Sequence, residues 1–280
     1  MTYLLNFGKL MAFLKLDAGV GRSAASGSNS LDGPGKAASP KSAPGLREVR
    51  SRKEVRNERV SGASASGKPG PMDGGGVRRV QVGCGPHNAI VGWWNTDIRS
   101  FPGIDAVMDA TQPWPYSGLE YVYGEHFLEH LTLDGALRFL EHAGNSLGSG
   151  GRIRLSTPNL EWVLLTHYAS GAEPEETLNG TMRINRAFHG WGHQFLYSRV
   201  MLEYLLTELG FRDVAFFSYG ESDTPALANL ERHGGFSVYE GQPSVIIAEA
   251  SRGDAPIAPS QELVDWIKSD YLRYARPGAH

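Results

Sequence analysis

The chain has 280 residues, of which 41% are hydrophobic and 20% are charged, a composition that is ordinary for a globular protein. Its formal net charge is -3, but residues 1–76 hold 12 basic and 6 acidic side chains, whereas the remainder holds 15 basic and 24 acidic ones. An acidic globular part argues against nucleic acid as the main partner, because neutralising phosphates dominates that kind of binding. No apolar run approaches the ~18 residues of a membrane span. The single cysteine, Cys84, excludes an intrachain disulfide framework and fits a reducing cytoplasm.

The first part of the chain differs from the rest in composition. Residues 23–76 are rich in Gly, Ser, Ala, Pro and Arg and show no apolar periodicity, which predicts disorder. Residues 1–16 are more apolar and are interpreted as a short amphipathic helix, a targeting segment or a spurious extension. Met72 precedes the first convincing strand and is a hypothetical alternative start. We therefore divide the chain into an N-terminal extension (1–76, disordered or spurious), one domain (77–250) and a C-terminal tail (251–280).

From residue 77 onward, short apolar strands alternate with amphipathic helices. The helical patterns cover residues 133–147, ended by Gly148, and 200–209, stopped by Gly210; a third lies in the tail at 261–274. Alternating strands and helices predict an α/β fold with a mostly parallel sheet covered by helices on both faces. Ligands of such sheets bind at the carboxyl ends of the strands. The predicted strands are 79–82, 105–108, 121–123, 152–156, 214–217 and 244–250, with a further strand ending at Asp97.

The first strand ends in a glycine turn, Gly83-Cys84-Gly85. Glycines permit a tight turn, and free backbone N–H groups there suit a carboxylate or phosphate. A dinucleotide fingerprint would place a third glycine where Asn88 stands and an acid about 20 residues further on, later than Asp97. An NAD(P)-dependent oxidoreductase is therefore the weaker interpretation.

Two acids follow the next two strands. Asp97 is placed to accept both ribose hydroxyls of an adenosine, and Asp109 is placed to accept from the adenine amino group. Each is also interpretable as an ordinary loop or capping acid. Their order after the glycine turn favours adenosine.

Four stretches carry a resemblance to a known family. The chain resembles the small class I S-adenosylmethionine (SAM)-dependent methyltransferases of the methyltransferase type 11-like family. The resemblance covers most of residues 77–250 and implies a Rossmann-like fold with a seven-stranded sheet and SAM as cofactor. The stretches are VGCGPHN at 82–88, GWWNTDI at 92–98, EHFLEHL at 125–131 and LGSGGRIRLSTPNL at 147–160.

The resemblance also implies roles for individual residues. The glycine turn would face the methionine part of SAM, and Cys84 within it is expected to pack rather than to act as a nucleophile. Two positions depart from the family pattern: Gln81 stands where many members carry an acid, and His87 where many carry a third glycine. The implied cofactor-binding residues are Gly83, Cys84, Gly85, Asp97 (ribose), Ile98 (against adenine), Asp109 and Ala110 (adenine edge), and Glu125, which with His126 would border the reactive methyl group.

The segment from His126 to His130 has an alternative interpretation. It matches H-x-x-E-H, the pattern of an inverted zinc protease site, in which two histidines share a helix face beside a glutamate. Zinc would need a third ligand that the sequence does not locate. The position directly after a strand favours the methyltransferase interpretation, so we expect no metal. Glu129 and His130 would then either act in catalysis or pack between helix and sheet.

A second histidine-rich segment, FHGWGHQ at residues 188–194, lies in an insertion (161–195) that we expect to cover the substrate. His189 or His193 would accept a proton from a substrate hydroxyl or amine. The alternative is a structural turn with Trp191 packed inside. Together with His126, these histidines are the candidate catalytic residues.

The sequence thus predicts a cytoplasmic methyltransferase that transfers a methyl group to a small-molecule or sugar-like acceptor by in-line displacement. We expect no nucleic-acid or membrane partner and leave the oligomeric state open. No Asn/Asp-Pro-Pro-Tyr/Phe motif follows the fourth strand, so the resemblance does not extend to enzymes that methylate amino groups of adenine or glutamine. The alternatives are an inactive methyltransferase-like binding or scaffold domain, an NAD(P)-dependent oxidoreductase, and a zinc hydrolase using His126, Glu129 and His130.

Overall fold

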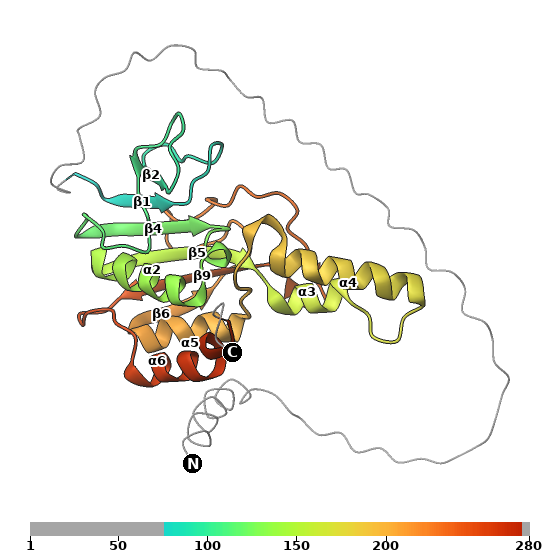
Figure 1. Ribbon diagram of the computed structural model, residues 1–280. Coiled ribbons are helices and arrows are strands. Elements are labelled where there is room, and N and C mark those ends of the chain that lie inside the picture. Colours follow the sequence, from blue (N-terminus) through green and yellow to red (C-terminus); the bar gives the residue numbers. More distant parts are fainter. Residues whose placement is uncertain (1–75, 276–280) are drawn as a thin grey trace, which may run out of the picture. The chain divides into compact units, whose positions relative to one another are not determined.

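The computed structural model describes residues 76–275, which contain a seven-stranded sheet (Figure 1). The strand order is β3-β2-β1-β4-β5-β9-β6, in which β9 is antiparallel to both neighbours and the pairs from β3 to β5 are parallel. This mostly parallel sheet confirms the predicted Rossmann-like fold, but loops cover one of its faces, so the expectation of helices on both faces is wrong. The strands are β1 (Arg79–Val82), β2 (Trp94–Asp97), β3 (Ala106–Val107), β4 (Leu119–Glu125), β5 (Leu147–Pro158), β6 (Phe211–Phe216) and β9 (Val245–Arg252), with a separate pair of β7 (Val238–Tyr239) and β8 (Gln242–Pro243).

The helices begin and end where local side chains satisfy the backbone. Thr132 caps α2 by accepting from the Gly135 N–H at 3.1 Å, and Ser198 caps α5 by accepting from the Met201 N–H at 3.1 Å. Gly210, with φ of 100°, ends α5 in the left-handed conformation that glycine tolerates. The helices are α2 (Leu133–Ser146), α3 (Leu160–His167), α4 (Pro174–His189), α5 (Arg199–Leu209), α6 (Gln261–Ile267) and α7 (Arg273–Ala275), with 3-10 turns η1 (Leu128–His130) and η2 (Gly190–Gly192) and a π-helical turn η3 (Lys268–Leu272).

The two faces of the sheet are covered differently. On one face, alternate strand residues such as Val122 and Ile153 join α2, α5 and α6 in the main hydrophobic core. On the other face, Tyr123 joins a smaller cluster with loop residues Ile90, Trp93, Leu227 and Leu230. Because successive side chains of a strand point to opposite faces, one face of the sheet packs against helices in the main core and the other packs against loops.

The predicted elements agree with the structure in type and order. The helices at 133–147, 200–209 and 261–274 are confirmed as α2, α5 and the α6–η3–α7 run. Strand β5 begins at Leu147, five residues before the predicted strand, because α2 passes directly into it. The expectations for residues 1–75, including the alternative start at Met72, lie outside the described residues. Within residues 76–275, no helix combines the length and apolarity that crossing a membrane requires.

Parallel pairing brings the carboxyl ends of β1, β2, β3 and β4 to one edge of the sheet. The insertion that we expected to cover the substrate contains α3, α4 and η2. Figure 1 shows α3 and α4 beyond the carboxyl ends of β4 and β5. Candidate ligand-binding residues and the insertion are therefore found at the same edge.

Candidate functional site

The glycine turn after β1 is held in place by hydrogen bonds to Thr96 and Asp97 at the end of β2. Gly83 and Gly85 have φ of 60° and 58°, which side chains with a Cβ adopt only at a cost. The Cys84 N–H donates to the Thr96 carbonyl at 3.1 Å, and the Gly85 N–H donates to Asp97 Oδ2 at 3.1 Å. These two bonds tie the turn to the end of β2, so the predicted cofactor residues of these two strands lie together. They also occupy the N–H groups of Cys84 and Gly85, so the expectation that these groups are free for a ligand is wrong.

The surroundings of Asp97 fit an adenosine. Asp97 Oδ1 accepts from the Arg99 N–H at 3.0 Å and lies 3.6 Å from Arg99 Nε, whereas Oδ2, which accepts from the Gly85 N–H, keeps a second lone pair for a ligand hydroxyl. The adjacent Ile98 is 65% exposed, which leaves an apolar surface for a flat ring. A Cβ built on Gly85 meets nothing within 4 Å, so this glycine borders open space. The residues present are therefore compatible with the nucleoside part of SAM.

Asp109 and Ala110 form the turn that follows β3. Asp109 Oδ1 accepts from the Thr111 N–H at 2.9 Å and from the Thr111 hydroxyl at 2.7 Å, and these bonds hold the pKa of Asp109 below its usual value. Ala110 is buried, and its carbonyl accepts from Trp114 Nε1 at 2.9 Å. The Asp109 carboxylate thus makes the local contacts of a capping acid, which was the alternative to ligand binding.

Gln81 and Asn95 are structural residues of this edge that the sequence analysis did not recognise. Gln81 donates from Nε2 to the Asn88 carbonyl at 3.0 Å and accepts at Oε1 from the Ile90 N–H at 3.2 Å. Asn95 Oδ1 accepts from the same N–H at 2.8 Å, and Asn95 Nδ2 donates to the Trp93 carbonyl at 3.0 Å. An amide can donate and accept at once, which an ionised carboxylate cannot. The sequence signal that could have identified Gln81 and Asn95 is a polar residue inside a short buried strand.

Residues 125–127 connect the glycine turn to a second region. A Cβ on Gly83 would lie 2.4 Å from Phe127 Cδ2, so the Phe127 ring packs directly on this glycine. Glu125 is 6% exposed, and its Oε1 accepts from the backbone N–H groups of Arg232 at 2.7 Å and His233 at 2.9 Å. The structure therefore places Glu125 against the loop that precedes β7.

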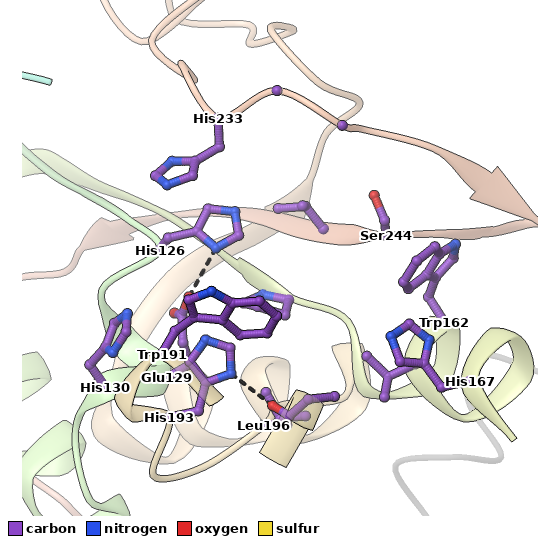
Figure 2. Close-up of a pocket in the computed structure, with 16 residues that line it drawn as sticks. His126, Glu129, His130, Trp162, His167, Trp191, His193, Leu196, His233 and Ser244 are labelled. Atoms are coloured by element: carbon purple, nitrogen blue, oxygen red, sulfur yellow. Dashed lines mark hydrogen bonds and ion pairs between the residues drawn. The ribbon is translucent and has the colours of Figure 1, made fainter. Parts of the chain in front are cut away.

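Beside these residues lies a cavity of about 550 Å³, which we call the histidine pocket (Figure 2). Its wall combines the segment after β4, helix α3, the η2 turn and the loop before β7. Glu129 is the one carboxylate among the described residues that line it, and none of those residues is Lys or Arg. The five lining histidines are His126, His130, His167, His193 and His233.

The centre of the histidine pocket is a carboxylate bonded to an imidazole. Glu129 is fully buried; its Oε1 lies 3.0 Å from His126 Nδ1, and its Oε2 accepts from the Thr157 hydroxyl at 3.1 Å. The rings of His126 and His233 have centroids 4.2 Å apart. Figure 2 shows His126 between His233 and Glu129. A carboxylate on one ring nitrogen orients the imidazole.

His193 reaches the pocket from a separate part of the chain. Its Nδ1 lies 2.8 Å from the Ala187 carbonyl, which only accepts, so Nδ1 carries the proton. The following Gln194 N–H donates to the Glu129 carbonyl at 2.7 Å. The rings of His130 and His193 lie with their centroids 5.2 Å apart. The insertion is therefore fastened to the segment after β4 at this point.

The structure brings together some of the predicted catalytic residues and separates others. His126 and His193 both line the histidine pocket, whereas His189, at the exposed end of α4, is not among its lining residues. Trp191 is 71% exposed with φ of 56°, so the alternative of a structural turn with Trp191 packed inside is wrong.

The expected shared helix face of His126 and His130 is also wrong. His126 has φ of 46° and precedes the 3-10 turn Leu128–His130, so H-x-x-E-H does not form an α-helix. The residue types that can ligate a metal gather differently: Glu129 and His130 meet His193 from the insertion.

No protein-family model matches the chain, and no curated protein matches it. Among solved structures, a SAM-dependent methyltransferase from Archaeoglobus fulgidus is 19% identical, with 64% of this chain and 88% of that chain covered and a TM-score of 0.39. One from Mesorhizobium loti is 16% identical, with 65% and 93% covered and a TM-score of 0.39. The CurJ carbon methyltransferase is 14% identical over 64% of this chain, with a TM-score of 0.39, and the match spans 49% of its length. All three are methyltransferases by name; the type 11 assignment stays a prediction.

Proposed function

We propose that this protein is a cytoplasmic SAM-dependent methyltransferase acting on a hydroxyl of a small-molecule or sugar-like acceptor. One observation carries the proposal: residues 125–127 connect the two regions, with Phe127 packed on Gly83 and His126 lining the histidine pocket. A cofactor held at the glycine turn would therefore lie next to the pocket in which an acceptor binds. The proposed cytoplasmic location of the protein rests on its single cysteine, which fits a reducing compartment.

The cofactor would be held by the carboxyl edge of β1, β2 and β3. Gly83, Cys84 and Gly85 would present backbone to the methionine part, Asp97 would accept from the ribose, and Ile98, Asp109 and Ala110 would border the adenine. SAM supplies a methyl group that its sulfonium already makes electrophilic. The protein then has to align the acceptor oxygen with the methyl carbon and exclude water.

His126 is the proposed general base. It would take the hydroxyl proton as the acceptor oxygen forms its bond to the methyl carbon and the carbon–sulfur bond breaks, leaving S-adenosylhomocysteine. Glu129, 3.0 Å from Nδ1, would stabilise the resulting imidazolium. His193 is the second candidate for this role. A cavity of about 550 Å³, partly lined by Trp162 and Trp191, has the dimensions of a small-molecule site.

The test is calorimetric binding of SAM and S-adenosylhomocysteine to the whole chain and to Asp97→Asn. We expect micromolar binding by the whole chain and roughly 10- to 100-fold weaker binding by the variant, because hydrogen bonds to a charged group contribute about 1.5–3 kcal/mol. The matched control is Glu120→Gln, which changes an acid at the start of β4, away from the carboxyl edge.

Absence of binding by a folded, monodisperse chain would overturn the proposed function. SAM binding without S-adenosylhomocysteine production from any hydroxylated small molecule or sugar would instead support the binding or scaffold alternative.

A further inference from the structure

We propose that Glu129, His130 and His193 form a binding site for one divalent transition-metal ion at the wall of the histidine pocket. The candidate ligand atoms of these three side chains all lie within 4.8 Å of one another. Ligands bound about 2.1 Å from a tetrahedral ion are roughly 3.4 Å apart, so the three groups need to close by only a small side-chain movement. His130 is exposed and can rotate to make it.

The buried carboxylate of Glu129 would be stabilised by a positive charge. The side chain is fully buried, and an isolated carboxylate away from water is costly unless a cation compensates it. Among the described residues, the ion-pair partner of Glu129 is His126, and neither Lys nor Arg lines the pocket. A bound divalent cation supplies this charge. The bonds from His126 and Thr157 then hold the carboxylate in place, as outer hydrogen bonds commonly do for metal-ligating carboxylates.

The hydrogen bonding of His193 leaves its ligand nitrogen available. Because the Ala187 carbonyl accepts from Nδ1–H, the lone pair of the neutral ring is on Nε2. Donation from the second ring nitrogen to a backbone carbonyl is the usual arrangement around metal-bound histidines, since it fixes both tautomer and ring orientation. Figure 2 shows this bond and places His193 close to His130 and Glu129.

The backbone holds the two segments of the site together. The N–H groups of Gln194 and Phe195 both point to the Glu129 carbonyl, at 2.7 and 3.3 Å. Trp191 and Gly192, with φ of 56° and 84°, form the left-handed bend that turns the chain toward His130. Left-handed backbone at a non-glycine residue is strained and is retained where the surroundings require it. The approach of His193 to Glu129 and His130 is thus fixed by tertiary contacts.

Two imidazoles and one carboxylate favour Zn²⁺, Mn²⁺, Fe²⁺ or Co²⁺ over Mg²⁺ and Ca²⁺, which prefer all-oxygen ligands. Three protein ligands leave coordination positions open toward the pocket. Resting on the proposed function, the open positions would bind the acceptor hydroxyl and lower its pKa before methyl transfer. The acceptor class is then a molecule with an oxygen ligand next to or identical with the methylated hydroxyl.

The experiment titrates the whole chain, prepared without a histidine tag and stripped with a chelator, with Zn²⁺ by calorimetry and with Co²⁺ by visible absorption. We expect one ion per chain and a Co²⁺ d–d spectrum. His130→Ala and His193→Ala should each weaken binding at least tenfold. His167→Ala is the matched control, because His167 lines the same pocket from α3 and is not one of the three proposed ligands; it should leave the affinity for the ion unchanged.

No bound ion, or equal affinity in the whole chain, His130→Ala and His193→Ala, would overturn the site. Equal loss in His167→Ala would also overturn it, since binding would then depend on the pocket as a whole. Melting curves check that each variant is folded. If His193→Ala is unfolded, the affinity of His130→Ala, a change at an exposed side chain, decides the test. Metal binding and SAM binding are separate readouts. If the chain binds SAM but no metal ion, only this inference is overturned; if it binds the ion but not SAM, only the proposed function is overturned.

Discussion

The glycine edge, meaning residues 81–110 at the ends of β1, β2 and β3, and the histidine pocket are built over different sequence distances. In the glycine edge, the bonds that matter join near neighbours, such as Gly85 to Asp97 and Gln81 to Asn88. The histidine pocket gathers segments from residue 126 to residue 245. A short local segment can therefore define the first region, whereas the second exists only once the whole domain has folded.

A buried ion network supports the pocket wall that carries His233. Arg154 is fully buried in β5, on the face of the sheet opposite the main core; it donates from Nε to Glu231 at 2.7 Å and from Nη1 to Glu249 in β9. Glu231 is followed by Arg232 and His233, whose backbone N–H groups donate to Glu125. The position of the loop at residues 231–233 thus depends on charges from three strands or loops far apart in the sequence.

The largest expected effect comes from Arg154→Met. It leaves the buried Glu231 without its cation and Glu249 with only Arg152, 4.0 Å away, so the free energy of unfolding should fall by about 3–5 kcal/mol. Denaturant unfolding followed by circular dichroism measures this. The control is Arg138→Met, which breaks the exposed Arg138–Asp134 pair on α2 and should cost less than about 1 kcal/mol. Similar losses in both variants would mean that the pocket wall does not depend on this network.

A smaller effect separates the two glycines of the turn. Gly83→Ala combines a left-handed backbone with a Cβ 2.4 Å from the Phe127 ring, and we expect a loss of about 2–4 kcal/mol. Gly85→Ala has the same backbone cost but meets open space, so about 1 kcal/mol is expected. Its main effect should be weaker SAM binding, because its Cβ points into the space proposed for the cofactor. Equal stabilities would show that Phe127 moves aside without cost.

The fold is predictable from the sequence because local patterns determine it. Strand β1, helix α2 and helix α5 were recognised from their apolar periodicity and from the residues that end them, and the structure has them within a residue or two. The start of β5 at Leu147 was missed, because its first residues include three glycines, which carry no strand pattern. The strand begins there because Leu147 pairs with Leu119 of β4, a tertiary effect; the register then shifts, and pairing resumes at Arg152.

The candidate site was predicted less completely for the same reason. The residues of the glycine edge follow one another along the chain, so order alone placed them together. His126 and His193 were singled out separately, but nothing in the sequence showed that His193 approaches Glu129, or that His233 stacks beside His126. These contacts depend on a left-handed Trp191 and on the loop held by Glu125, and neither has a sequence pattern of its own.

The smallest expected effect on stability concerns Cys84, whose reactivity tests whether the glycine edge is closed around it. Burial, and then the nearby Asp97 carboxylate, raises the pKa of the thiol from its ordinary 9.0 to about 11. At pH 8 the thiolate fraction is then about 100-fold lower than in an unfolded chain, so alkylation by iodoacetamide should be at least that much slower in the native protein. Because folding raises this pKa, the thiol's contribution to stability is complete below pH 9 and is lost as pH rises toward 11. Intact-mass measurement of alkylation with and without denaturant checks the rate, and rapid native modification at pH 8 would show that the turn opens to solvent.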